Sequence, residues 1–169
     1  MLKKPNIAAL LLATVAFIGG QAYAGEASYP GAACVKWSAG DPQPLLSYSE
    51  ILNPSSTAWL RVDCPITRTD FDSFLHDAGV ESSWVRMVDR HYTSNGSCRL
   101  ISYSHNTDGT ASFWATGTRY TAGTGNQAQV LNTGSLDGEN GASHLYFSCL
   151  IPPTYAGNYS TLVTYYVNQ

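Results

Sequence analysis

Most of the chain after residue 57 alternates between apolar and polar positions, and a period of two is typical of half-buried β-strands. The clearest stretch is residues 58–64, where Leu60, Val62 and Cys64 share one face. Further strands are expected at residues 84–92, 97–104, 111–121, 127–132, 144–151 and 159–167. Seven or eight short strands with short connections predict an all-β fold, an antiparallel β-sandwich or jelly roll.

Turn residues separate the expected strands. Asn95-Gly96 is a strong type I′ hairpin signal, so residues 84–92 and 97–104 are expected to pair with each other. Asp108-Gly109 marks the next turn. Residues 69–79 have acids in a first turn and Gly79 as a stop signal, which predicts one short helix beside the strands.

The beginning of the chain has the three parts of an export signal. Lys3 and Lys4 precede the apolar residues 7–17, and Ala22-Tyr23-Ala24 supplies small residues before a cleavage site. The apolar run is shorter than the ~20 residues that a spanning helix needs. We therefore expect residues 1–24 to be a signal peptide that is cleaved near Ala24, and the protein to be secreted to the periplasm or outside the cell.

The remainder of the chain, after the signal, is short enough for one domain. Residues 25–33 are small and flexible in type, so a loose lead-in is expected there. Residues 34–169 are then a single disulfide-bonded β-sandwich.

All four cysteines follow the expected cleavage site, and an even number in an exported chain implies two disulfides. Four cysteines allow three pairings, among which the sequence alone does not choose. We favour Cys34–Cys64 and Cys98–Cys149, because each bridge then ties one part of the domain without a crossed connection. No pair has the CxxC spacing of a metal or redox site.

The charge of the chain excludes some partners. Residues 25–169 carry seven basic and twelve acidic side chains, a net charge of −5. Phosphate binding needs a basic face, so nucleic acid is not expected as a partner, and neither is an anionic membrane surface. No apolar stretch after the signal is long enough to insert into a bilayer.

Catalytic and metal motifs are weak. No GxSxG or HExxH motif is present, and Ser143 and His144 are neighbours on a strand, so they point to opposite faces. Asp89 and His91 share a strand face and are a candidate chelating pair, although an ordinary strand pair is favoured. No cofactor is expected, with Ca²⁺ as the alternative: weak candidate ligands in oxygen-rich segments are Asp70, Asp72, Asp137 and Glu139.

Aromatic residues are the other feature. Trp59, Trp84 and Trp114 all lie in expected strands, and exposed rings on a β-sandwich can stack on sugar rings. Packing in the core or on a covered face is the alternative for each. These three residues are the candidate ligand-binding set.

Cysteines and strands together form a frame. It consists of Cys34, then Val62-Asp63-Cys64-Pro65-Ile66, Ser97-Cys98-Arg99-Leu100 and Cys149-Leu150-Ile151-Pro152. This frame resembles a group of small exported bacterial proteins of unknown function. The resemblance implies a β-sandwich with two bridges and a bacterial source, and it implies no catalytic residues.

These features favour a secreted non-catalytic module that binds a polysaccharide or a cell-envelope component, or that is an extracellular structural component. A small secreted hydrolase, built on a carboxylate pair or an unmarked Ser-His-Asp set, is the enzymatic alternative. A third possibility is a subunit of an extracellular assembly, since the apolar final strand, residues 160–167, can add to the sheet edge of a neighbour.

Overall fold

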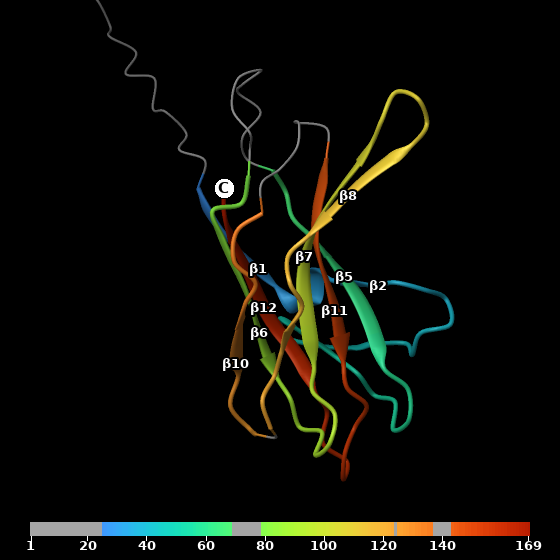
Figure 1. Cartoon of the computed structure of the whole chain (residues 1–169). Helices are drawn as coiled ribbons and strands as arrows, with labels where there is room; N and C mark the ends of the chain where they lie inside the picture. The colour runs from blue at the N-terminus through green and yellow to red at the C-terminus, as the bar shows by residue number, and fades with distance from the viewer. Residues whose placement is uncertain (1–24, 69–78, 124, 137–142) are drawn as a thin grey trace, which may run out of the picture.

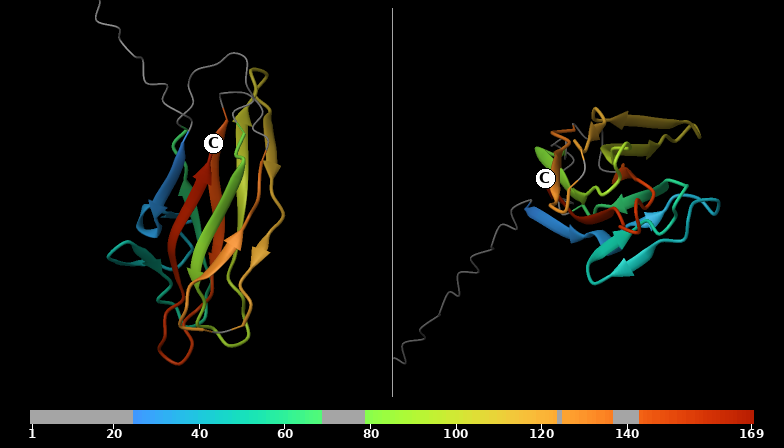
Figure 2. Two further views of the ribbon diagram at one scale, coloured as in Figure 1. Left: turned by 90° about the vertical axis from the view of Figure 1, so that its left-hand side faces the viewer. Right: turned by 90° about the horizontal axis from the view of Figure 1, so that it is seen from below.

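The computed structural model describes residues 25–68, 79–123, 125–136 and 143–169. These residues form twelve strands and one 3-10 turn, arranged as two antiparallel sheets that pack face to face (Figure 1 and Figure 2). The predicted β-sandwich is confirmed. The expected signal at residues 1–24, and the expected helix except its last residue, Gly79, lie outside the described residues.

The first sheet, sheet A, has β12 at its centre. β12 pairs with β6 along one edge, and with β4 and β1 along the other. β10 and β3 form the margins of the sheet. Its strands are β1 (Glu26–Pro30), β3 (Leu45–Ser47), β4 (Glu50–Leu52), β6 (Ser82–Val88), β10 (Gln129–Asn132) and β12 (Thr161–Asn168).

The second sheet, sheet B, has β11 at its centre, between β5 and β7. The hairpin of β7 and β8 projects beyond the rest of the sheet (Figure 1). The turn η1 (Gly31–Ala33) leads from β1 in sheet A to β2 in sheet B. The strands of sheet B are β2 (Val35–Lys36), β5 (Leu60–Pro65), β7 (Ser97–His105), β8 (Ala111–Ala115), β9 (Arg119–Tyr120) and β11 (His144–Ile151).

The core lies between the sheets and follows the predicted alternation. Phe147 of β11 meets Tyr165 of β12 edge to face, with ring centroids 5.6 Å apart. The hydroxyl of Tyr165 donates to the carbonyl oxygen of Pro65 at 2.8 Å, so its polar end is satisfied although the ring is buried.

Both favoured disulfides are present, Cys34–Cys64 and Cys98–Cys149. Cys98 and Cys149 face each other directly in the register of β7 and β11. Cys34 comes immediately before β2, beside Cys64 of β5. Each bridge therefore joins neighbouring strands of sheet B, and sheet B is the covalently reinforced layer of the sandwich.

The predicted pairing of residues 84–92 with residues 97–104 is wrong. β6 lies in sheet A and β7 in sheet B, so the connection between them crosses from one layer to the other. A type I′ turn needs positive φ at both central residues, and neither Asn95 nor Gly96 has it. The backbone N–H of Gly96 instead donates to the buried carboxylate of Asp89.

The beginning of the domain also differs from expectation. Residues 25–33 were expected to be a flexible lead-in, but they form β1 and η1. The short β4 pairs with only part of one edge of β12, and β1 pairs with the rest of that edge. Four short strands thus precede Leu60, and residues 111–121 divide into β8 and β9. For these reasons the described residues form twelve strands, whereas seven or eight were predicted.

The final strand is not available for addition to a neighbour. Both edges of β12 are hydrogen-bonded within sheet A. A register shift between Leu162 and Thr164 also changes its core face, so that Leu162, and not Val163, is fully buried with Tyr165 and Val167.

Candidate functional site

Sheet B presents one side to the core and the other to the solvent. In β5, Leu60, Val62 and Cys64 point inward and are fully buried, whereas Arg61 and Asp63 lie on the opposite side. The strand register extends that side over the whole sheet. We define the outer face of sheet B by the residues Val35, Trp37, Arg61, Asp63, Arg99, Tyr103, Phe113, Tyr120, Tyr146, Ser148 and Leu150.

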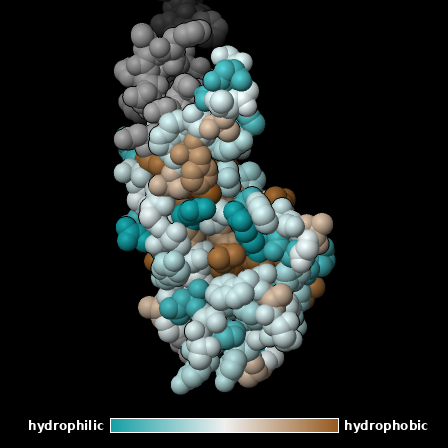
Figure 3. Space-filling model, turned by 45° about the vertical axis from the view of Figure 1, so that its right-hand side comes forward, coloured by the Kyte–Doolittle hydropathy of each residue, from teal (hydrophilic) through white to brown (hydrophobic). Residues whose placement is uncertain are grey.

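Large rings are exposed on this face. The exposed fraction is 56% for Trp37, 51% for Phe113 and 64% for Tyr120. Figure 3 shows the molecule from the side of sheet B, where hydrophobic patches alternate with hydrophilic side chains. Single exposed rings are common, but several on one sheet face with polar groups between them are typical of a binding surface.

Two arginines contact these rings. The guanidinium carbon of Arg61 lies 4.0 Å from the centroid of the Trp37 ring, and that of Arg99 lies 5.7 Å from the centroid of the Phe113 ring. Such cation–π contacts orient both partners. Arg61 also donates from Nε to Ser148 Oγ at 3.3 Å, so its side chain is fixed at two points.

A half-buried carboxylate lies beside Arg61. Burial raises the pKa of Asp63, and the Asp41 carboxylate nearby adds to the increase, while a hydrogen bond from Ser148 and the charge of Arg61 act against it. The Oδ1 atom of Asp63 is buried and accepts no hydrogen bond. Asp63 is thus a polar group whose hydrogen-bonding capacity is only partly used.

The three predicted tryptophans do not share one surface. Trp84 lies in β6 of sheet A, where its ring stacks on Tyr166 with centroids 5.2 Å apart. Trp59 immediately precedes β5 in sheet B and is 39% exposed. Trp114 is in β8, opposite the buried Ser102, and it therefore points to the core side of sheet B at the margin.

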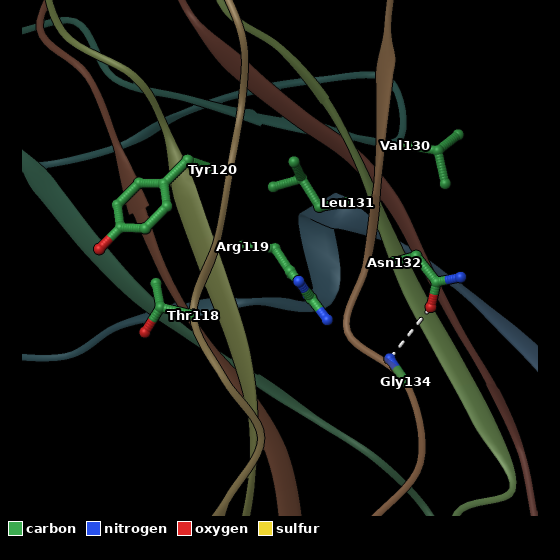
Figure 4. Close-up of a pocket in the computed structure, with 7 residues that line it drawn as sticks. All are labelled: Thr118, Arg119, Tyr120, Val130, Leu131, Asn132 and Gly134. Atoms are coloured by element: carbon green, nitrogen blue, oxygen red, sulfur yellow. Dashed lines mark hydrogen bonds between the residues drawn. The ribbon is translucent and has the colours of Figure 1, made fainter.

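A groove opens at one margin of the sandwich, between β9 of sheet B and β10 of sheet A (Figure 4). It has a volume of about 730 Å³. Figure 4 shows Arg119 and Leu131 pointing into the space between the two strands, with Tyr120 and Val130 directed away from it. The described lining residues are Thr118, Arg119, Tyr120, Val130, Leu131, Asn132 and Gly134.

Asp89 and His91 do not form a chelating pair. The Asp89 carboxylate is fully buried and accepts the backbone N–H of His91 and of Gly96 at 2.9 Å each, together with the hydroxyl of Thr121. The Nδ1 atom of His91 accepts from the backbone of the same connection. Both side chains therefore hold the connection between β6 and β7, which is a structural role.

The remaining candidates for chemistry do not converge. Ser143 is buried and His144 is exposed, as expected for neighbours on a strand. In the part of the chain that the structure describes, no three His, Cys, Asp or Glu side chains gather as metal ligands would. The weak calcium candidates Asp70, Asp72, Asp137 and Glu139 lie outside that part.

The sequence pattern missed Trp37 and Tyr120. Trp37 follows the two-residue strand β2 and lies outside every predicted strand. Tyr120 lies in the predicted strand 111–121, but the structure divides that segment, and Tyr120 ends the separate two-residue strand β9. Their common face follows only from the pairing of β2 with β5 and of β9 with β7. For Trp37 the residue type was the available signal, since a large aromatic ring outside every predicted strand is a candidate for an exposed ligand contact.

No family model matches the sequence, and no curated protein matches it. Two solved structures align with most of the chain at low similarity. A family two carbohydrate esterase from Cellvibrio japonicus aligns at 7% identity over 85% of this chain and 34% of its own, with a TM-score of 0.42. A low affinity xylan binding module, CBM86, from Roseburia intestinalis aligns at 14% identity over 84% of this chain and 93% of its own, with a TM-score of 0.44.

The chain thus spans about a third of the length of the esterase. At these scores neither likeness bears on what this chain does. Nor does any described helix have the length and apolar character that crossing a membrane requires.

Proposed function

We propose that this protein is a secreted, non-catalytic module that binds a polysaccharide on the outer face of sheet B. The observation that carries the proposal is the row of side chains that crosses this face from Trp37 to Tyr120. Arg61, Leu150 and Ser97 lie between them in register, one on each intervening strand.

The row has the dimensions and chemistry of a glycan platform. Neighbouring strands are about 4.8 Å apart, so the four steps from β2 to β9 place the two rings about 19 Å from each other. Sugar rings present apolar faces that stack on aromatic rings and hydroxyls that need hydrogen-bond partners. Arg61 and Ser148 supply such partners beside Trp37.

The contacts of the carboxylates favour binding over hydrolysis. A glycoside hydrolase uses two carboxyl groups that face the scissile bond. Asp63 has one oxygen buried, and Asp41 accepts the backbone N–H of Ser38 at 2.8 Å, so that it closes the turn after Trp37. Both groups thus serve the local structure, and we expect no release of reducing sugar from a bound polymer.

The compartment in this proposal rests on the bridges and the sequence. Two disulfides fit an oxidising environment. Cleavage near Ala24 stays a prediction, which N-terminal sequencing of the exported protein checks.

The binding test is affinity electrophoresis of the purified protein in gels that contain a panel of neutral and acidic polysaccharides. We expect retardation by at least one polymer, and its loss in Trp37→Ala and Tyr120→Ala. The matched control is Tyr48→Ala, because Tyr48 is a fully exposed ring in the β3–β4 turn of sheet A. Unchanged migration of the wild type in every gel, or equal retardation of Trp37→Ala, would contradict the proposal.

A further inference from the structure

The groove between β9 and β10 lies at the end of the proposed binding row. Tyr120 is the last ring of the row, and it also belongs to the rim of the groove. A chain laid over the outer face of sheet B from Trp37 to Tyr120 therefore meets this groove at the margin of the sandwich. Its volume of about 730 Å³ lies within the range of small-molecule sites.

Arg119 provides the charge of the groove. It is the one charged side chain among the described lining residues, and none of those residues is a carboxylate. Within the described structure its guanidinium forms no hydrogen bond, ion pair or ring contact, in contrast to Arg61 and Arg99. Figure 4 shows that it nevertheless points into the space between the two strands, and not away from the protein.

The other polar side chains of the groove lie on its rim. Figure 4 shows Thr118 and Asn132 directed away from the space between β9 and β10, and the Oδ1 atom of Asn132 accepts the backbone N–H of Gly134 at 3.0 Å. Leu131 is almost fully buried and supplies an apolar base.

A guanidinium that points into a groove, with no carboxylate among the described lining residues, is a site for an anion. Arginine presents its N–H groups in a fork that matches a carboxylate or a sulfate, both of which occur on acidic sugars. The apolar base suits the body of a sugar, and the Tyr120 ring lies at the rim on the outer face of sheet B. The chain as a whole is acidic, so the attraction for an anion must come from this local group.

We propose that the groove binds the anionic group of an acidic sugar residue, so that the module prefers acidic polysaccharides over their neutral counterparts. This inference rests on the proposed polysaccharide-binding function and names its ligand class. Binding through one cation also predicts a modest loss of the preference at high salt.

The test compares two polymers that differ only in charge, polygalacturonate and the same polymer with its carboxyl groups reduced. A second pair, dextran sulfate and dextran, distinguishes a sulfate from a carboxylate as the preferred anion. Affinities are measured by affinity electrophoresis for the wild type, Arg119→Ala, Arg119→Lys and Trp37→Ala. Arg86→Ala is the control, because it removes the same charge from an exposed position on sheet A.

We expect the wild type to bind the charged member of one pair about tenfold more tightly, and Arg119→Ala to bind both members equally. Arg119→Lys retains part of the preference, and Arg86→Ala retains all of it. Equal affinity of the wild type for both members of both pairs, or a preference that survives in Arg119→Ala, overturns the inference.

The two proposals fail in different ways. When the wild type binds without charge preference and Trp37→Ala abolishes that binding, the anion site is wrong and the polysaccharide platform stands. When Trp37→Ala binds as well as the wild type, the platform is wrong.

Discussion

The guanidinium of Arg61 lies over the ring of Trp37, with its central carbon 4.0 Å from the ring centroid. This contact connects β5 to the end of β2 at the margin of sheet B, and the hydrogen bond to Ser148 extends it to β11. One face of the Trp37 ring is thereby held by the protein. An exposed ring that is held in place loses little freedom when a ligand stacks on it.

Arg61→Ala is therefore expected to weaken polysaccharide binding by roughly five- to tenfold, corresponding to about 1 kcal/mol for a cation–π contact at an exposed site. The ring remains, but its orientation is no longer fixed. Affinity electrophoresis measures the loss, and circular dichroism checks that the fold is unchanged. Arg86→Ala is the matched control, because Arg86 contacts Trp84 on sheet A in a similar way, at 5.4 Å. A larger loss of binding in the control would contradict the role of Arg61.

Asp89→Ala is expected to lower the free energy of unfolding by about 3 kcal/mol or more, because two backbone N–H groups and the hydroxyl of Thr121 lose their buried acceptor. Urea denaturation followed by fluorescence measures the change. The control is Asp108→Ala: Asp108 accepts the backbone N–H and the hydroxyl of Thr110, but in an exposed turn. We expect little change in the control midpoint, and equal effects of the two substitutions would show that the Asp89 network is not a main support of the crossing connection.

The pH dependence of stability is expected to include a contribution from Asp63. Burial raises the pKa of this carboxyl, so the folded state holds its proton more tightly than the unfolded state does. The native state is then favoured at low pH, and stability is lost as pH rises from the ordinary aspartate pKa of 3.8 through the raised value.

Asp63→Asn removes that loss. We expect the variant to melt at a higher temperature than the wild type at pH 7 and at nearly the same temperature below about pH 3. Ser148→Ala should have the opposite effect at pH 7, because the hydrogen bond from Ser148 lowers the pKa of Asp63. Thermal unfolding over this pH range is the measurement. A lower melting temperature of Asp63→Asn at pH 7 would rule out this account.

Two glycine substitutions are expected to differ in cost. A Cβ at Gly31 would lie 2.0 Å from the carbonyl oxygen of Leu162, in the backbone of β12, whereas a Cβ at Gly96 would lie 2.2 Å from the sulfur of Met87. The methionine side chain can move and the central strand cannot. We expect Gly31→Ala to cost about 3 kcal/mol or more and Gly96→Ala about half as much.

Denaturant titration of both glycine variants tests this order. The double variant Gly96→Ala with Met87→Ala supplies the control: relief of the clash should make the effects of the two substitutions non-additive. An equal or smaller cost at Gly31 would mean that η1 can shift away from β12.

The strands that could be predicted from sequence are the long ones. β11 has the predicted bounds because it is buried on one face along its whole length, and β5 shows the predicted alternation for the same reason. Periodicity reports burial on one face, and it says nothing of which strands pair. The partners of β6 were therefore assigned from Asn95-Gly96, a local signal that the buried Asp89 overrides.

The candidate site was harder to predict than the fold. Trp59, Trp84 and Trp114 were chosen because they lie in strand patterns, yet membership of a strand does not tell which sheet or which side a residue occupies. Trp37 and Tyr120 lie on one face through pairings between residues about 20 to 30 positions apart, each of which involves a two-residue strand. The anion groove depends on the approach of β9 and β10 from different sheets, which no local pattern contains.

The central position of β12 in sheet A has a consequence for how the domain folds. The last of the described strands in chain order is the one that β6, β4 and β1 all require as a partner, so sheet A has no middle until it arrives. The ribosome delivers a polypeptide from its amino end, so the hairpin of β3 and β4 and the pair of β6 and β10 can form before β12 is available. We expect these two parts of sheet A to join only when β12 is added between them, which makes completion of the sheet a late step of folding.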